Sequence, residues 1–295
     1  MPVIRPFRSV RPAKDMAPDI AALPYDVYNR REAKEVVERN PLSFLKIDRA
    51  ETQFPDETDM YSAEVYERAR DTLAKMMKDG SFVTEKEPCY YLYALTYEGR
   101  TQTGIAACAS IDDYQNQVIK KHENTRADKE QDRIRHVDVC EAQTGPIFLA
   151  YRSQAPLRQV IDRVTAGEAL YDFTAPDGIT HRVWVVWEEE QMGIIRDTFA
   201  GMEQIYIADG HHRCASAVKV GLRRRENNSA HTGEEEYNFF LSVLFSAEEL
   251  KILDYNRVVK DLNGYEKDAF LEKIGEKFSV ECLGEKSYRA RKKDE

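Results

Sequence analysis

One short segment constrains the fold of this chain more than any other: an apolar run at residues 205–208, the dipeptide Asp209-Gly210, and a polar segment that starts at His211. β-Branched and aromatic residues dominate the run, which predicts a buried strand. Gly210 tolerates a positive φ, so the backbone can turn sharply there. The residues that follow include small helix formers. We therefore expect a strand, a tight turn and a helix in direct succession.

A helix N-terminus after such a turn is a typical site for an anion, because free backbone N–H groups and the positive end of the helix dipole meet there. His211, His212 and Arg213 stand in the first turn, and a guanidinium can bind a phosphate with two hydrogen bonds. Asp209 adds a carboxylate that can hold a metal or orient a hydroxyl. In the alternative interpretation, Asp209 is an N-cap and the histidines are ordinary surface residues. The combination of Asp-Gly before the histidine pair and Arg after it favours a phosphate site.

A second dense polar segment, residues 119–136, lies upstream. Residues 128–135 are well explained as a solvated helix with charges at i,i+4 spacing. That explanation fits less well for four titratable residues that follow an apolar run: Lys120, Lys121, His122 and Glu123. Titratable groups gathered in two distant segments are typical of an active site that folding assembles.

Composition narrows the class of protein. A net charge of −9 and a pI near 5.4 argue against a general nucleic-acid binder, which needs a basic face. The arginines at 223–225 are better explained as the cationic end of a helix. Five scattered cysteines without a CxxC pair fit a reducing cytosol, and we interpret Cys214 as a packing residue. We find no signal peptide and no apolar run of membrane length, so we expect a cytoplasmic protein without a membrane partner.

Periodicity and turn signals predict the other elements. We expect helices near 30–39, 61–79, 156–164, 189–200 and 265–277. We expect strands near 44–47, 147–151, 181–187 and 237–245, and a hairpin that turns at residues 98–101.

Several motifs in the same order resemble the bacterial and archaeal family known as domain of unknown function 1015. They lie at residues 4–8, 23–27, 40–45, 121–125, 145–149, 170–174 and 208–213. The resemblance covers nearly the whole chain, and the family name implies no function. Members of this family are usually longer, so we expect this chain to be truncated at its C-terminal end.

Residues 118–221 also resemble, more distantly, the archaeal free-serine kinase, which has a ParB/sulfiredoxin-like fold. The shared features are His122-Glu123, Lys129-Glu130, the strand at 145–148 and the turn at 209–213. The match departs from the kinase at residues 151–202, where the kinase has a short connection. The resemblance implies an α+β fold with a ParB/sulfiredoxin-like mixed-sheet core and a strand–turn–helix phosphate site. The order of the predicted elements divides the chain into an N-terminal α/β segment at 1–87, a core at 88–226 that by this resemblance binds a nucleotide, and a C-terminal α/β segment at 227–295.

The same resemblance implies a small-molecule kinase that transfers phosphate from ATP or ADP to a hydroxyl compound, with free L-serine as the expected acceptor and O-phosphoserine as the product. It implies that Glu123 accepts the hydroxyl proton, with His122 and Asp209 as further catalytic residues. Asp209 would contact Mg²⁺. The nucleotide phosphates would be bound by Gly210, His211, His212, Arg213 and Lys121.

Two alternatives remain open at the level of sequence. One is a ParB-like DNA-partition module, although the chain has neither a DNA-reading helical domain nor a basic face. The other is a nucleotide-binding regulator without turnover. The acceptor, the choice between ATP and ADP, and the oligomeric state are not defined by the sequence.

Overall fold

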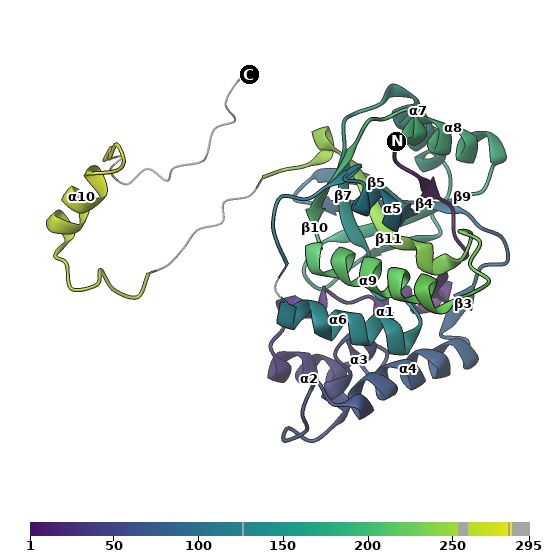
Figure 1. Cartoon of the computed structure of the whole chain (residues 1–295), viewed down its shortest axis with the longest axis horizontal. Helices are drawn as coiled ribbons and strands as arrows, with labels where there is room; N and C mark the ends of the chain where they lie inside the picture. The colour runs from purple at the N-terminus through teal and green to yellow at the C-terminus, as the bar shows by residue number, and fades with distance from the viewer. Residues whose placement is uncertain (126, 253–258, 283, 285–295) are drawn as a thin grey trace. The chain divides into compact units, whose positions relative to one another are not determined.

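A nine-stranded mixed sheet organises the larger of the two units into which the chain divides (Figure 1). The structure is a computed structural model that describes residues 1–125, 127–252, 259–282 and 284. The units are Met1–Leu250 and Lys251–Glu295, and each is described by itself. In the second unit the described residues form one helix, α10 (Lys267–Gly275).

The strands are β1 (Ile4–Arg5), β2 (Val10–Pro12), β3 (Phe82–Thr84), β4 (Tyr90–Tyr97), β5 (Arg100–Ser110), β6 (Ile119–Lys120), β7 (Ile147–Tyr151), β8 (Tyr171–Thr174), β9 (Thr180–Val186), β10 (Ile205–Asp209) and β11 (Phe239–Ser246). The main sheet has the order β6-β10-β7-β11-β5-β4-β9-β8, and β1 pairs with β5. β2 and β3 form a separate antiparallel pair. Because β11 and β1 lie in the same sheet as the strands between residues 88 and 226, the sheet draws on all three predicted segments.

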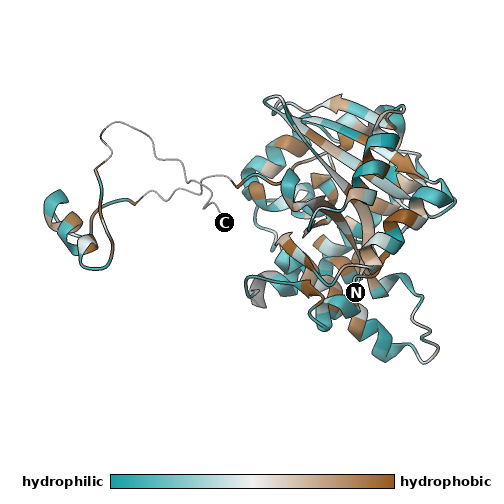
Figure 2. Cartoon of the chain, turned by 90° about the horizontal axis from the view of Figure 1, so that it is seen from above, coloured by the Kyte–Doolittle hydropathy of each residue, from teal (hydrophilic) through white to brown (hydrophobic). Residues whose placement is uncertain are grey.

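The helices of the first unit are α1 (Ala17–Ile20), α2 (Arg30–Arg39), α3 (Leu45–Asp48), α4 (Ala63–Lys78), α5 (Ile111–Gln115), α6 (Ala127–Cys140), α7 (Ala155–Thr165), α8 (Glu189–Ala200) and α9 (His211–Asn227). Figure 1 shows α6 between α9 and a group formed by α2, α3 and α4, and contacts join α6 to both α9 and α4. Helices in this unit carry hydrophilic and hydrophobic stretches in alternation (Figure 2), as expected of amphipathic helices that cover a core.

The main core is formed by every second residue of the strands, because alternate side chains point to the same face of a sheet. Ile105, Ala107 and Ala109 of β5 all enter it and are fully buried. Strands β4, β7, β10 and β11 contribute in the same alternating way, and α7, α8 and α9 add apolar side chains. A smaller cluster joins the N-terminal helices to β3 through Ile20, Ile47, Met76 and Phe82.

Most of the predicted elements are confirmed, and the mixed α+β class is among them. The strand predicted at 44–47 is wrong, because Leu45–Asp48 is the short helix α3. The strand predicted from residue 237 begins only at Phe239, after a 3-10 turn at Glu236–Asn238. Among the described residues, none of the helices combines the length and hydrophobicity that a bilayer crossing requires.

Candidate functional site

The predicted strand, turn and helix are present at residues 205–227. β10 ends at Asp209, Gly210 has the left-handed conformation (φ 89°, ψ 31°), and α9 begins at His211. A residue with a Cβ atom is strained in this conformation, so glycine is the residue that suits it. A Cβ on Gly210 would also lie 3.1 Å from guanidinium nitrogens of Arg213. The turn is therefore shaped by the local sequence and packed closely against its own arginine.

Arg213 holds the turn against the segment that leads into β7. Its Nη2 donates to Oδ2 of Asp209 at 2.8 Å, and its Nη1 donates to the carbonyl oxygen of Pro146 at 2.5 Å. The side chain of Arg213 is 18% exposed, whereas that of Asp209 is 71% exposed. The guanidinium is thus fixed beside the N-terminus of α9, in the place that the sequence predicts for a phosphate ligand.

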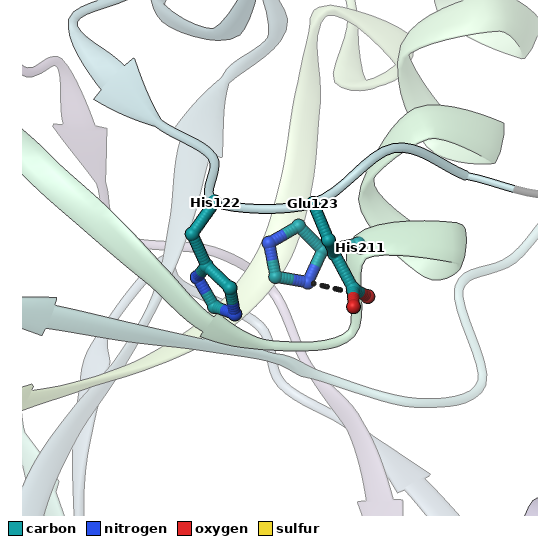
Figure 3. A group of neighbouring side chains, drawn as sticks. All are labelled: His122, Glu123 and His211. Atoms are coloured by element: carbon teal, nitrogen blue, oxygen red, sulfur yellow. Dashed lines mark ion pairs between the residues drawn. The ribbon is translucent and has the colours of Figure 1, made fainter. Parts of the chain in front are cut away.

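The second predicted segment reaches the same turn through strand pairing. β6 lies parallel to β10, with Ile119 opposite Ile205 and Lys120 opposite Tyr206. The residues that follow β6 therefore run past the end of β10. Oε1 of Glu123 lies 3.2 Å from Nδ1 of His211, as the dashed line in Figure 3 marks. The structure brings together two titratable residues that lie far apart in the sequence.

His122 completes a compact group with these two residues (Figure 3). Its ring meets that of His211 edge to face, with the ring centroids 4.4 Å apart. One potential ligand atom from each of His122, Glu123 and His211 lies within 4.8 Å of the other two. This is the one group of three or more metal-type ligands found in the described part of the chain.

His211 is the buried member of the group. It is 5% exposed, and its Nε2 has no hydrogen-bond partner among the described residues. Burial lowers the pKa of His211, and the nearby His122 lowers it further, whereas Glu123 and Asp209 act in the opposite direction. The imidazole is consequently neutral near pH 7, with one nitrogen free to accept a proton or bind a ligand.

The other predicted site residues lie around this group. Lys121 directs its ammonium toward the ring of Tyr114, 5.7 Å from the centroid. His212 is half-buried, and its Nδ1 has no partner in the part of the chain that the structure describes. Cys214 is fully buried, and burial raises its pKa, as expected of a packing residue rather than a reactive thiol.

The surroundings of Asp209 bear on the predicted magnesium contact. Magnesium prefers several oxygen ligands, but the carboxylate of Asp209 already forms an ion pair with Arg213. A cation bound directly to this carboxylate would lie beside a guanidinium. The magnesium contact at Asp209 stays a prediction, and a contact through water would place the ion farther from this guanidinium.

Glu130 is a functional residue candidate that sequence reasoning placed in a solvated helix. It is 5% exposed, accepts a hydrogen bond from Thr125 Oγ1 at 2.6 Å and pairs with Lys219 of α9. Burial would raise the pKa of Glu130, but these hydrogen bonds outweigh burial and lower it. The buried carboxylate thus ties the loop that carries Glu123 to the helix that carries His211.

Two cavities adjoin the turn, and sequence reasoning missed most of the residues that line them. A cavity of 320 Å³ is lined by Arg213, Pro146 and residues of the N-terminal helical region, and a cavity of 250 Å³ reaches His212. Both cavities share the side chains of Tyr25, Asp48, Arg133 and His136. Among the sequence motifs, those at residues 23–27, 40–45 and 145–149 contribute to the first cavity, and the motif at 23–27 also contributes to the second.

Arg133 is the buried charge between these cavities. Its Nε donates to Oδ2 of Asp132 at 3.0 Å, and its guanidinium carbon lies 4.2 Å from the centroid of the Tyr25 ring. Asp48 accepts a hydrogen bond from Thr144 Oγ1 at 2.5 Å. The wall of the two cavities thus contains both a cation and a carboxylate.

Comparison with protein families decides the affiliation of the chain. The family model described as protein of unknown function (DUF1015) matches residues 4–295. The chain belongs to the DUF1015 family. In this DUF1015 chain the Gly210 turn and the Glu123 segment both lie inside the matched region. Searches among curated proteins and among solved structures each gave no match.

Proposed function

We propose that this DUF1015 chain is a small-molecule kinase that transfers a phosphoryl group from ATP or ADP to a hydroxyl compound, with free L-serine as the first acceptor to test. The observation that carries the proposal is the 3.2 Å approach of the Glu123 carboxylate to His211 in the first turn of α9. A candidate proton acceptor and a candidate phosphate site thereby share one location. Phosphoryl transfer depends mainly on such positioning and on neutralised charge.

The phosphate half of the site would be the Gly210 turn. The first N–H groups of a helix have no partner within the helix, and those of α9 follow directly after Gly210. Arg213 supplies a guanidinium whose position is fixed by Asp209 and Pro146. Together they offer directed hydrogen bonds and positive charge to the phosphates of a nucleotide.

The acceptor half would be Glu123. Its side chain is 55% exposed, so a small hydroxyl compound can approach it. The hydroxyl proton would pass to the carboxylate as the hydroxyl oxygen bonds to phosphorus, and the bond from phosphorus to the nucleotide oxygen would break. A positioned base is typically worth ~10²–10⁴-fold in rate. His122 and His211 would orient Glu123 toward the acceptor.

The same proposal includes a specific fold for the core of the chain and a cellular location. A ParB/sulfiredoxin-like core, as in the serine kinase that the sequence resembles, would comprise β6, β7, β10 and α9. All five cysteines are free thiols, which suits a reducing cytoplasm.

The direct test is to incubate the full chain with L-serine and with the magnesium salt of ATP or ADP, and to search for O-phosphoserine by mass spectrometry. We expect the product from the wild-type chain and its strong reduction in Glu123→Gln. Nucleotide binding without product from any hydroxyl amino acid would favour a regulatory module. The absence of both binding and product would contradict the proposal.

A further inference from the structure

The geometry points to a transition-metal site formed by His122, Glu123 and His211, separate from any magnesium contact at Asp209. The three residues come from the loop after β6 and from the start of α9, and Figure 3 shows their side chains gathered at one point. Their ligand atoms lie within 4.8 Å of one another. In tetrahedral zinc sites, ligand atoms stand about 3.4 Å apart for metal–ligand bonds of about 2.1 Å. A small rotation of the exposed side chains would reach this spacing.

The donor set selects the class of metal. Two imidazoles and one carboxylate suit zinc, cobalt, iron or nickel, whereas magnesium and calcium prefer oxygen ligands alone. Three protein ligands also leave at least one coordination position open to water or to a phosphate oxygen. Both His122 and Glu123 are exposed, so the open position would face solvent.

A second observation points independently to a ligand here. His211 is 5% exposed, and its Nε2 is buried without a partner among the described residues. A buried polar atom without a partner costs free energy that a ligand can recover. Because Nδ1 of this imidazole faces Glu123, an ion shared with that carboxylate needs either Nδ1 itself or a turned ring that brings Nε2 to the same point. The carboxylate of Glu123, 3.2 Å from Nδ1 of His211, contributes negative charge for a cation at this point.

Metal binding itself does not depend on the proposed kinase activity. One consequence of metal binding does rest on the proposed function. A bound ion would take Glu123 as a ligand, so Glu123 could no longer accept the hydroxyl proton. We therefore expect a transition metal to inhibit phosphoryl transfer at concentrations that fill the site.

The test is a titration of the full chain, freed of metal by a chelator, with Co²⁺. The absorption spectrum of Co²⁺ separates nitrogen and oxygen ligands from the five free thiols of the chain. We expect a single strong site with nitrogen and oxygen ligands in the wild-type chain. Because His122 and Glu123 are exposed, His122→Ala and Glu123→Gln should fold normally and should weaken binding by about tenfold or more.

A matched control is His231→Ala. His231 Nδ1 lies 2.9 Å from Oε2 of Glu235, which makes a His–carboxylate pair without a third metal ligand in the described residues. This variant should bind Co²⁺ as the wild-type chain does. Unchanged affinity in both site variants, or an equal loss in the control, would overturn the inference. Co²⁺ binding without kinase activity would contradict the proposed function alone, and phosphoserine formation without Co²⁺ binding would contradict the metal site alone.

Discussion

Nδ1 of His211 lies 3.2 Å from Oε1 of Glu123, although the two residues belong to different elements of the fold. Parallel pairing of the short strand β6 with β10 brings them together. Thr125 and Glu130 then hold the intervening loop, since the buried carboxylate of Glu130 also pairs with Lys219. The site therefore depends on an edge strand of two residues and on the ion pair between the buried Glu130 carboxylate and the exposed Lys219 ammonium.

Gly210→Ala should weaken nucleotide binding by about tenfold, ~1.4 kcal/mol. A side chain at φ 89° is strained, and its Cβ would lie 3.1 Å from the Arg213 guanidinium, which must then move. The measurement is isothermal titration calorimetry with ATP and ADP. Gly99→Ala is the control, because Gly99 has φ 77° and no atom of the described residues lies within 4 Å of the added Cβ. Equal affinity for nucleotide in the two variants would argue against a phosphate site at the turn.

Arg213→Ala should weaken nucleotide binding by ~1.5–3 kcal/mol, the range for a hydrogen bond to a charged group. Arg213→Lys should recover only part of this loss, because an ammonium cannot form the two parallel bonds of a guanidinium. Arg223→Ala, which removes a half-exposed arginine of the same helix, should leave affinity unchanged. Nucleotide affinity that does not respond to Arg213→Ala would remove Arg213 from the site.

Gly221→Ala should destabilise the fold by ~1–3 kcal/mol, the usual cost of overpacking. The added Cβ would overlap the carbonyl oxygen of Tyr237 and lie 2.7 Å from Cδ1 of Ile111. Gly193→Ala is the matched change within another helix, where the nearest atom would be Arg196 Nη2 at 3.7 Å. That variant should gain up to ~1 kcal/mol from helix propensity. Urea unfolding of both variants measures the difference, and stabilisation by Gly221→Ala would contradict the close contact.

His136 should make the stability of the fold depend on pH. It is 3% exposed, and burial lowers its pKa, with a further decrease caused by Arg133. The unfolded chain takes up a proton near pH 6.5, whereas the folded chain resists it, so the free energy of unfolding falls as the pH drops below 6.5. Between pH 7.5 and 5.5 the wild-type chain should lose about 1 kcal/mol more than His136→Gln. Parallel pH profiles of the two proteins would refute a neutral buried His136.

Local signals account for the parts of the fold that the sequence predicts well. Asn29 and Glu32 form a reciprocal capping box at the start of α2, and the two-residue turn at Glu98 and Gly99 has positive φ at both positions. The apolar stretch at 44–47 is ambiguous between strand and helix, because a short buried segment of either kind has the same composition. Packing on the N-terminal helices decides it in favour of α3.

The candidate site likewise has one part that its local sequence predicts and another part that depends on contacts between distant segments. The turn from Asp209 to Arg213 is a local structure, so its sequence predicts its shape. The approach of Glu123 to this turn is indicated in the sequence only by the titratable residues gathered in two segments and by the resemblance to a kinase, because strand pairing is not local. The cavity wall at Asp48 and Arg133 arises from tertiary contacts, such as the hydrogen bond that His136 Nε2 of α6 donates to the carbonyl oxygen of Ile47 of α3 at 3.2 Å, and it carries no motif of its own.

The kinetics of Glu123→Gln test the central claim most directly. The substitution keeps the size of the side chain and most of its hydrogen bonding but removes its ability to take a proton. Turnover and nucleotide affinity should be measured together on one preparation, with L-serine as acceptor. The account predicts a fall in turnover of ~10²–10⁴-fold with unchanged nucleotide affinity. Full activity in the variant, or a loss of affinity as large as the loss of rate, would contradict Glu123 as the proton acceptor of a phosphoryl transfer at this turn.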